Sequence, residues 1–226
     1  MWQFTKGDCL TLLKDLSGAS IDLILWNPPF GTTQQPWDEK LDWPAIFAEC
    51  FRVLKPTGSL VIHCSVPFNY TLIRAAPRPP SYSWYWNKVN PTTPLLAKKQ
   101  PMRQVEEVLV WGGKTYYPQR VGDEPRSYIP SGKTAYVGAV SENNKRVFVK
   151  GKYQTHYLEA KSCVDGFSTR PPAMVEMFIK AYTKEGDTIL DPTCYKGLSG
   201  KVAISLGRKL IGFDKYFEAE APGAAE

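Results

Sequence analysis

The sequence has few of the residues that build metal centres and disulfide frameworks. It contains 2 histidines in 226 residues, and its 5 cysteines are scattered without a C-x-x-C pair. Structural zinc sites need closely spaced cysteine and histidine ligands, and disulfide frameworks belong to oxidising compartments. We therefore expect reduced thiols in a cytosol-like compartment, and no metal ion.

Long apolar runs are also missing. No stretch approaches the roughly 18 uncharged apolar residues of a membrane span, and Met1–Cys9 lacks the apolar segment of a secretory signal. Apolar residues make up 43% of the chain and charged residues 22%, close to ordinary globular values. We expect a cytoplasmic protein with no membrane partner, built as one domain or as one domain with a large insertion.

Positive charge is concentrated in the middle of the chain, within an overall net charge of +6. Residues 74–163 carry 15 basic and 6 acidic groups, whereas residues 1–73 carry 5 and 7, and residues 164–226 carry 8 and 9. The segment Arg74–Arg103 has six cations and no carboxylate. Such a surplus favours a polyanionic partner such as nucleic acid. A solvated basic surface stays open as the alternative.

Alternating strand and helix patterns in the first part of the chain predict an α/β fold. The apolar run Ile21–Trp26 predicts a buried strand that ends at Asn27-Pro28-Pro29. Asp8–Leu16 and Trp43–Leu54 have helical apolar spacing, and Ser59–Cys64 predicts a second buried strand. Strand, helix and strand in this order indicate a parallel sheet.

The C-terminal part repeats this pattern. Pro171 and Pro172 can begin a helix, and a strand from Thr188 ends at Asp191. Gly197–Leu206 then predicts a helix, and Lys209–Phe213 predicts a strand that ends in Asp214. We expect residues 1–112 and 164–217 to form one domain, residues 113–163 an irregular β-rich insertion, and residues 218–226 a disordered tail.

Thr188–Asp214 is typical of a nucleotide-binding β-loop-α-β unit. Asp214 lies 23 residues after Asp191, where an acid can accept hydrogen bonds from ribose hydroxyls. Gly197 and Gly200 would let the backbone approach a ligand closely. The loop is not G-x-G-x-x-G, so an ordinary crossover stays open.

Two motifs together resemble the amino-directed DNA methyltransferases that use S-adenosylmethionine. Asn27-Pro28-Pro29-Phe30 matches their catalytic [DNS]-P-P-[YFW] motif, and DPTCYKGLSG at 191–200 resembles their cofactor motif DPFxGSGTTG. The catalytic motif comes first and the cofactor motif last, which is the permuted order of the β-group of these enzymes. Further landmarks stand in the same order: Gly7-Asp8, RVLKPTGSLVIH at Arg52–His63, and STRPP at 168–172.

This resemblance covers about residues 4–112 and 165–217, and it implies a Rossmann-like methyltransferase fold with a mostly parallel sheet and helices on both faces. The chain departs from the family at two positions. Tyr195 stands where the family usually has the first glycine of its loop, and Pro171 where lysine is common. Either change could weaken cofactor binding.

The resemblance implies S-adenosyl-L-methionine as the cofactor. It places Asp8 and Cys9 beside the adenine, Asp214 on the ribose, and Asp191 with the loop from Thr193 to Leu198 near the methionine portion. The expected cofactor residues are Asp8, Cys9, Asn27, Thr169, Asp191, Thr193, Cys194, Lys196, Gly197, Leu198 and Asp214. Helix capping by the three aspartates and core packing of Cys9 stay open as structural alternatives.

The catalytic motif fits methyl transfer to an exocyclic amine, whose lone pair is delocalised into the base. Two acceptors on the amino hydrogens, Asn27 Oδ1 and the Pro28 carbonyl, would free that lone pair. Pro28 and Pro29 fix the backbone, and Phe30 would stack on a base turned out of the duplex. Asn27 cannot act as a general base, so the proton would leave to water. A rigid Asn-Pro-Pro turn without catalytic function stays open.

Double-stranded DNA is the expected partner, with recognition in residues 113–163. Asn in the first motif position favours adenine N6 over cytosine N4, and an RNA substrate or an inactive nucleic-acid-binding protein are the alternatives. The expected DNA contacts are Lys88, Lys98, Lys99, Arg103, Arg120, Arg126, Lys133, Lys145 and Arg146. For each one a surface charge without contact stays open. We expect a bacterial or phage-encoded enzyme, solitary or paired with a restriction enzyme, and leave monomer and homodimer open.

Overall fold

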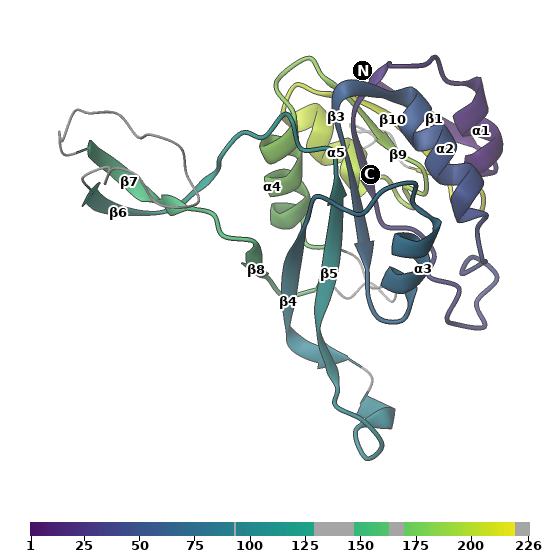
Figure 1. Cartoon of the computed structure of the whole chain (residues 1–226), viewed down its shortest axis with the longest axis horizontal. Helices are drawn as coiled ribbons and strands as arrows, with labels where there is room; N and C mark the ends of the chain where they lie inside the picture. The colour runs from purple at the N-terminus through teal and green to yellow at the C-terminus, as the bar shows by residue number, and fades with distance from the viewer. Residues whose placement is uncertain (93, 129–146, 163–169, 220–226) are drawn as a thin grey trace, which may run out of the picture. The chain divides into compact units, whose positions relative to one another are not determined.

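The computed structural model describes residues 1–92, 94–128, 147–162 and 170–219, and they separate into two compact units. The larger unit contains residues 1–117 and 156–226, and the smaller one residues 118–155 (Figure 1). The smaller unit is narrower at both ends than the predicted insertion 113–163. Residues 113–117 and 156–162 therefore group with the larger unit.

An eight-stranded sheet forms the centre of the larger unit. Its strands, in spatial order, are β1 (Trp2–Lys6), β10 (Lys209–Asp214), β9 (Thr188–Asp191), β2 (Ile21–Trp26), β3 (Leu54–Cys64), β5 (Arg103–Trp111), β4 (Tyr82–Thr92) and β8 (Tyr157–Glu159). β5 runs antiparallel to β3 and β4, and the other neighbours are parallel. The predicted mostly parallel sheet is confirmed.

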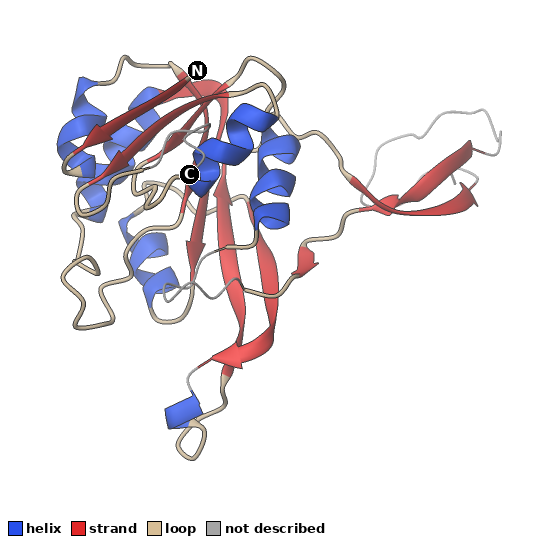
Figure 2. Ribbon diagram, turned by 180° about the vertical axis from the view of Figure 1, so that it is seen from behind, coloured by secondary structure: helices blue, strands red, loops and turns tan. Residues whose placement is uncertain are grey.

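Helices cover both faces of this sheet. One face carries α1 (Cys9–Asp15), α2 (Trp43–Val53) and α3 (Phe68–Ala75), and the other carries α4 (Pro172–Tyr182) and α5 (Leu198–Ser205) (Figure 2). A short 3-10 helix, η1 (Pro94–Leu96), lies between β4 and β5. The longest described helices have 11 residues, and none of those described is long and apolar enough to cross a membrane.

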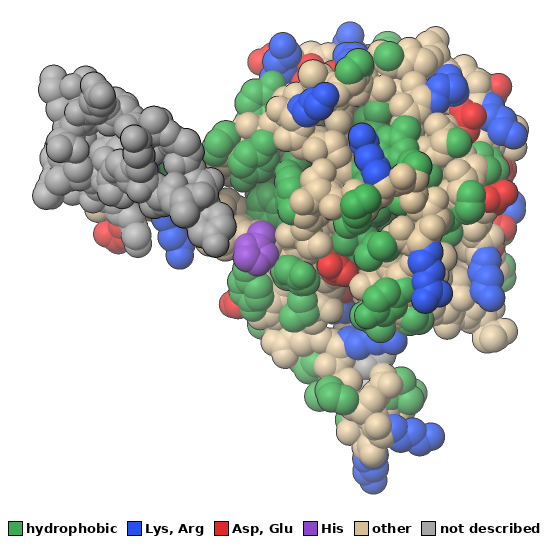
Figure 3. All heavy atoms as spheres, in the orientation of Figure 1, with side chains coloured by type: hydrophobic (Ala, Val, Ile, Leu, Met, Phe, Trp, Pro, Cys, Tyr) green, Lys and Arg blue, Asp and Glu red, His purple; other side chains and the backbone are tan. Residues whose placement is uncertain are grey.

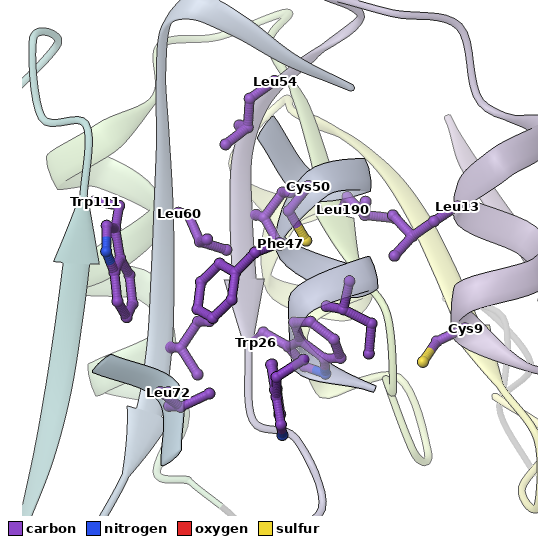
Figure 4. Close-up of a cluster of buried hydrophobic side chains, with 14 of the residues drawn as sticks. Cys9, Leu13, Trp26, Phe47, Cys50, Leu54, Leu60, Leu72, Trp111 and Leu190 are labelled. Atoms are coloured by element: carbon purple, nitrogen blue, oxygen red, sulfur yellow. The ribbon is translucent and has the colours of Figure 1, made fainter. Parts of the chain in front are cut away.

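Side-chain alternation in β2 explains why its sequence is apolar from Leu23 to Trp26. Ile24 and Trp26 point to the face covered by α1 to α3, whereas Leu23 and Leu25 pack with α4 and α5. A parallel strand buried on both faces has a continuous apolar run instead of an alternating pattern. Figure 4 shows the first of these clusters, with Trp26 and Phe47 at its centre.

The smaller unit is an antiparallel pair, β6 (Arg120–Tyr128) and β7 (Val147–Tyr153), in keeping with the predicted β-rich insertion. The guanidinium of Arg120 lies 4.0 Å from the centre of the Tyr153 ring and donates to the Gly151 carbonyl at 3.2 Å. Lys133, Lys145, Arg146 and the side chain of Arg126 lie outside the described residues, as do residues 220–226 of the predicted tail.

Candidate active site

A cavity of about 320 Å³ opens where β1, β2, β9 and β10 end. Ligands of open α/β sheets bind outside the carboxyl ends of the strands, so the position follows from the topology. Both predicted motifs line the cavity, since Phe30 and Asp191 face the same space. The predicted residues that line it are Asp8, Cys9, Asn27, Pro28, Pro29, Phe30, Asp191, Thr193, Cys194, Leu198 and Asp214.

Thr193 connects the two motifs by hydrogen bonds. Its hydroxyl accepts from the indole Nε1 of Trp26 at 2.9 Å and donates to the backbone carbonyl of Asn27 at 3.2 Å. The loop after β9 therefore holds the first residue of the Asn-Pro-Pro-Phe loop after β2. Asn27 itself is exposed and Pro28 is buried, so the amide of Asn27 is open to a ligand in the cavity.

Phe30 lies in the cavity wall and packs against the core cluster behind it. Its ring stacks on Phe68 of α3, with ring centres 4.7 Å apart and planes 19° apart. Trp37 also lines the cavity, whereas Trp43 is buried in the core. The stacked contact fixes the plane of the Phe30 ring, which is the property that a platform for a flat base requires.

Asp38 organises the loop that follows the Asn-Pro-Pro-Phe segment. Its carboxylate accepts from the backbone N–H groups of Gly31, Thr32 and Thr33 at 2.8, 2.9 and 2.7 Å. Burial raises the pKa of this carboxyl, but the bonds from the Thr33 hydroxyl and the three amides outweigh burial and lower it overall. Residues 31–38 thus form a fixed wall of the cavity. Asp38 was not among the site residues predicted from the sequence.

Asp214 has a comparable role at the end of β10. Its carboxylate accepts the backbone N–H groups of Tyr195 at 2.8 Å and of Tyr216 and Phe217 at 2.9 Å. The side chain therefore joins the loop after β9 to the loop after β10. A carboxylate has about four acceptor positions, so one remains for a hydroxyl of a ligand.

Asp191 is the last residue of β9 and is buried. It accepts from the Ser199 hydroxyl at 2.5 Å and from the Thr193 amide at 3.3 Å. Burial raises the pKa of Asp191 to about 7; the Ser199 and Thr193 bonds oppose this rise, the Asp214 charge adds to it, and Arg170 opposes it. The carboxyl consequently changes its charge near neutral pH.

Asp8 and Cys9 take the structural roles left open above while also lining the cavity. Asp8 Oδ1 accepts from the amide and hydroxyl of Thr11 at 2.9 and 3.0 Å, which caps the N-terminus of α1. Cys9 is 5% exposed and packs in the cluster below α2, and burial raises the pKa of its thiol to about 12. Cys9 is therefore an inert thiol at the wall of the cavity.

Tyr195 has a left-handed backbone conformation, which favours glycine. Its φ is 51°, in the left-handed region, which costs a non-glycine residue roughly 1–2 kcal/mol. The ring packs edge-on against Phe217 at 4.6 Å. Gly197, at φ 80°, has no room for a side chain, because a Cβ would lie 2.3 Å from the Trp2 ring. In the described loop from Thr193 to Leu198, the predicted cofactor residues Lys196 and Gly197 do not line the cavity.

A buried charged cluster forms another part of the cavity wall. Glu106 of β5 accepts from Lys88 Nζ at 2.9 Å and from Arg170 Nη2 at 3.2 Å, and all three side chains are at most 10% exposed. Glu106 and Arg170 line the cavity. Burial lowers the pKa of the neighbouring His63 well below 6.5, and the Arg170 charge lowers it further, so His63 is neutral.

This cluster corrects one sequence prediction. Lys88 does not present its ammonium to phosphates, because the group is buried and paired with Glu106. Trp84, Trp86 and Lys88 alternate along β4 on its buried side, a period that would have indicated the burial of Lys88. Arg170 stands in the STRPP segment and supplies a cation beside Pro171, the position where lysine is common.

The other predicted residues fall into two groups. Lys98, Lys99 and Arg103 are exposed on the β4–β5 hairpin, and Arg120 is exposed on β6. Thr169 lies outside the described residues.

Comparison with known proteins gives consistent matches over almost the whole chain. The sequence pattern of a family described as DNA methylase (N6_N4_Mtase) matches residues 21–221. The type II methyltransferase M.BamHI of Bacillus amyloliquefaciens is 28% identical over 92% of this chain and 53% of its own length. The DNA adenine methyltransferase YhdJ of Escherichia coli K12 is 26% identical over 92% of this chain and 76% of its own. The chain thus spans about half the length of M.BamHI.

Solved structures share the fold. A complex of M1.HpyAVI with S-adenosylmethionine superposes with a TM-score of 0.63 and 20% identity, covering 95% of this chain and 93% of the other. The cytosine-N4-specific PvuII DNA methyltransferase also has a TM-score of 0.63, with 20% identity, over 95% of this chain and 82% of its own. The fold is therefore the Rossmann-like methyltransferase fold expected from the motifs.

Proposed function

The chain belongs to the N6/N4 methyltransferase family described as DNA methylase, and from this premise we propose that it is a site-specific DNA methyltransferase acting on adenine N6. The methyl donor is S-adenosylmethionine, and the acceptor is a base turned out of duplex DNA. One observation carries the proposal: the Asn27 loop and the Asp191 loop line one cavity and are hydrogen-bonded through Thr193.

The residues of the cavity suit this cofactor. A volume of about 320 Å³ is in the range of small-molecule sites. Asp8, Asp191 and Asp214 supply three carboxyl groups to a ligand that carries a sulfonium and an ammonium charge. When bound, the cofactor supplies an electrophilic methyl group. Asp214 keeps an acceptor position for a ribose hydroxyl, and Arg170 offers a cation to the carboxylate of the methionine portion.

Asn27 and Pro28 prepare the amine of the base. The carboxamide Oδ1 of Asn27 and the Pro28 carbonyl accept the two amino hydrogens and turn the nitrogen lone pair out of the ring. Thr193 holds the Asn27 backbone, and the prolines restrict the loop, so this geometry exists before the base arrives. Phe30, fixed by Phe68, stacks on the base. Neutral Asn27 takes no proton, and the proton leaves to water after transfer.

Adenine is the proposed base because the motif begins with asparagine, and the relative YhdJ is named an adenine methyltransferase. Cytosine N4 is the second candidate, since the PvuII enzyme with the same fold carries that specificity in its name. Both exocyclic amines pose the same chemical problem, so the cavity chemistry described above serves either base.

We assign recognition to the smaller unit, residues 118–155, whose described cations include Arg120 on β6 and Lys150 and Lys152 on β7. We place the enzyme in the bacterial cytoplasm, encoded by the bacterium or by a phage.

The decisive experiment uses the purified chain, S-adenosylmethionine with a labelled methyl group, and unmethylated DNA of mixed sequence. The DNA is digested to nucleosides, which are separated. Label in N6-methyladenine supports the proposal, and label in N4-methylcytosine moves the activity to the second candidate. DNA binding without any transfer would refute both and leave an inactive binding protein.

A further inference from the structure

The β4–β5 hairpin extends beyond the sheet as an arm, defined here as residues 89–105. The last regular pair of the hairpin is Asn87 with Val105, and the register then shifts to Thr92 with Arg103. Beyond that point η1 and the turn after it project away from the sheet (Figure 1). All residues from Pro94 to Val105 are exposed, so the arm adds nothing to the core.

The base of the arm is fixed by hydrogen bonds. Lys88 Nζ donates to Thr92 Oγ1 at 3.2 Å as well as to Glu106, and Thr92 Oγ1 donates to the Arg103 carbonyl at 3.1 Å. The Gln104 amide donates to Asn87 Oδ1 at 3.0 Å. Because Glu106 also lines the cavity, the arm begins at the cavity wall and is held in a defined direction.

The arm combines positive charge with exposed apolar side chains. Its 17 residues contain Lys98, Lys99 and Arg103 and no carboxylate. Leu95 is 96% exposed at the tip, and Leu96, Met102 and Val105 are 39–46% exposed. Basic and apolar side chains lie together over this part of the molecule in Figure 3.

We propose that the arm is a second DNA-contacting element, separate from the smaller unit, in which the cations hold phosphates near the target base and Leu95 and Leu96 enter the duplex. The proposal rests on the proposed function for the identity of the polyanion. Cations without neighbouring acids fit phosphates better than a protein surface. Proteins that kink the duplex frequently insert apolar side chains between base steps, and this apolar tip extends from the wall of the cavity that would receive the base.

The charge half of the proposal is tested with the double variant K98A/K99A and a matched control, K184A/K209A. Lys184 and Lys209 are also exposed, but they lie at or near the N-terminal ends of β9 and β10. The cavity lies at the opposite, C-terminal ends of these strands. Binding to a fluorescent 25-base-pair duplex of arbitrary sequence is measured between 50 and 300 mM salt. Losing two phosphate contacts reduces the slope of log affinity against log salt by about 2, whereas the control keeps the wild-type slope. A wild-type slope in K98A/K99A would overturn the proposal.

The apolar half is tested with L95A/L96A. We expect roughly fivefold weaker duplex binding, with an unchanged salt slope because no charge is removed. Wild-type affinity in this variant would remove the tip from the interface. Sedimentation of wild type and L95A/L96A tests whether the tip instead binds a second copy of the chain. A wild-type dimer that dissociates in L95A/L96A, with DNA affinity intact, would assign the tip to that contact and refute its role in DNA binding.

Cofactor binding by calorimetry verifies that each variant is folded, since the arm lies outside the cavity. The binding assay needs no methyl transfer. A wild-type protein that binds duplex without methylating it would therefore refute the proposed function alone, whereas a wild-type salt slope in K98A/K99A refutes the arm alone.

Discussion

Asp191 makes the stability of the protein depend on pH in a direction opposite to that of most carboxyl groups. Burial raises its pKa from 3.8 to about 7 in the folded protein. Between these values the folded state keeps a proton that the unfolded chain has lost. The free energy of unfolding therefore falls as pH rises through this window, because the native state binds more protons. Below pH 3.8 the contribution is fully present, and above pH 7 it is lost.

The size of the effect follows from the same two values. Each pKa unit corresponds to about 1.4 kcal/mol, so the difference limits the change to about 4 kcal/mol between the ends of the window. Asp191→Asn keeps the shape of the side chain and removes the titration. We expect the variant to lack this fall and to be more stable than wild type at pH 8.

Urea unfolding followed by tryptophan fluorescence, at half-unit steps from pH 4.5 to 8.5, measures both curves. The informative quantity is the difference between the two proteins at each pH, because other titrating groups affect both equally. Parallel curves would show that Asp191 is ionised throughout, and the reasoning from its burial would then be wrong. The ionised carboxylate should also bind a cationic cofactor more tightly, so wild-type affinity should rise from pH 6 to pH 8 while that of the variant does not.

Three further predictions concern the two loops. Asn27→Ala should abolish methyl transfer and leave cofactor affinity, measured by calorimetry, within a few-fold of wild type; equal loss of both in a folded variant would make Asn27 structural. Thr193→Val removes the hydrogen bonds to Trp26 and Asn27, so we expect the free energy of unfolding to fall by about 1–3 kcal/mol and methyl transfer to become slower. Thr193→Ser keeps the hydroxyl and should restore both. A Thr193→Val enzyme of normal rate would disprove the connection between the loops. Asp38→Ala leaves three amides without their acceptor and should cost about 2 kcal/mol in urea unfolding, while Asp38→Asn keeps one acceptor oxygen and costs less; wild-type stability in Asp38→Ala would show that these bonds contribute little.

The central strands and their helices could be predicted because their signals are local. The run Ile21–Trp26 and the helix before Gly186 are apolar on the faces that the sheet buries, and prolines and glycines mark their ends. β1 was missed, since this edge strand is only partly buried. β8 has three residues, and its pairing with β4 joins positions 70 or more apart, for which no local pattern exists.

The site divides in the same way. Asn27, Asp191 and Asp214 stand at strand ends inside recognisable motifs, so their meeting could be predicted. Asp38 and Glu106 carry no such signal, because their importance comes from distant partners. Asp38 depends on the turn of residues 31–33, and Glu106 is buried only because Lys88 and Arg170 converge on it from other segments. A cation is placed on the surface by default when the strand that buries it is not identified, which is why Lys88 was assigned to DNA.

The order of the motifs along the chain has no bearing on how the site is assembled. Asn27 and Asp191 are 164 residues apart in sequence, yet β2 and β9 are neighbours in the sheet, paired Leu23 to Ile189 and Ile24 to Leu190. Parallel neighbours end at the same edge, so the loops that follow them must meet wherever they are encoded. The bond from Thr193 to the Asn27 carbonyl is the contact that this pairing makes available. A chain whose cofactor strand came first would form the same contact, provided that the two strands kept their pairing.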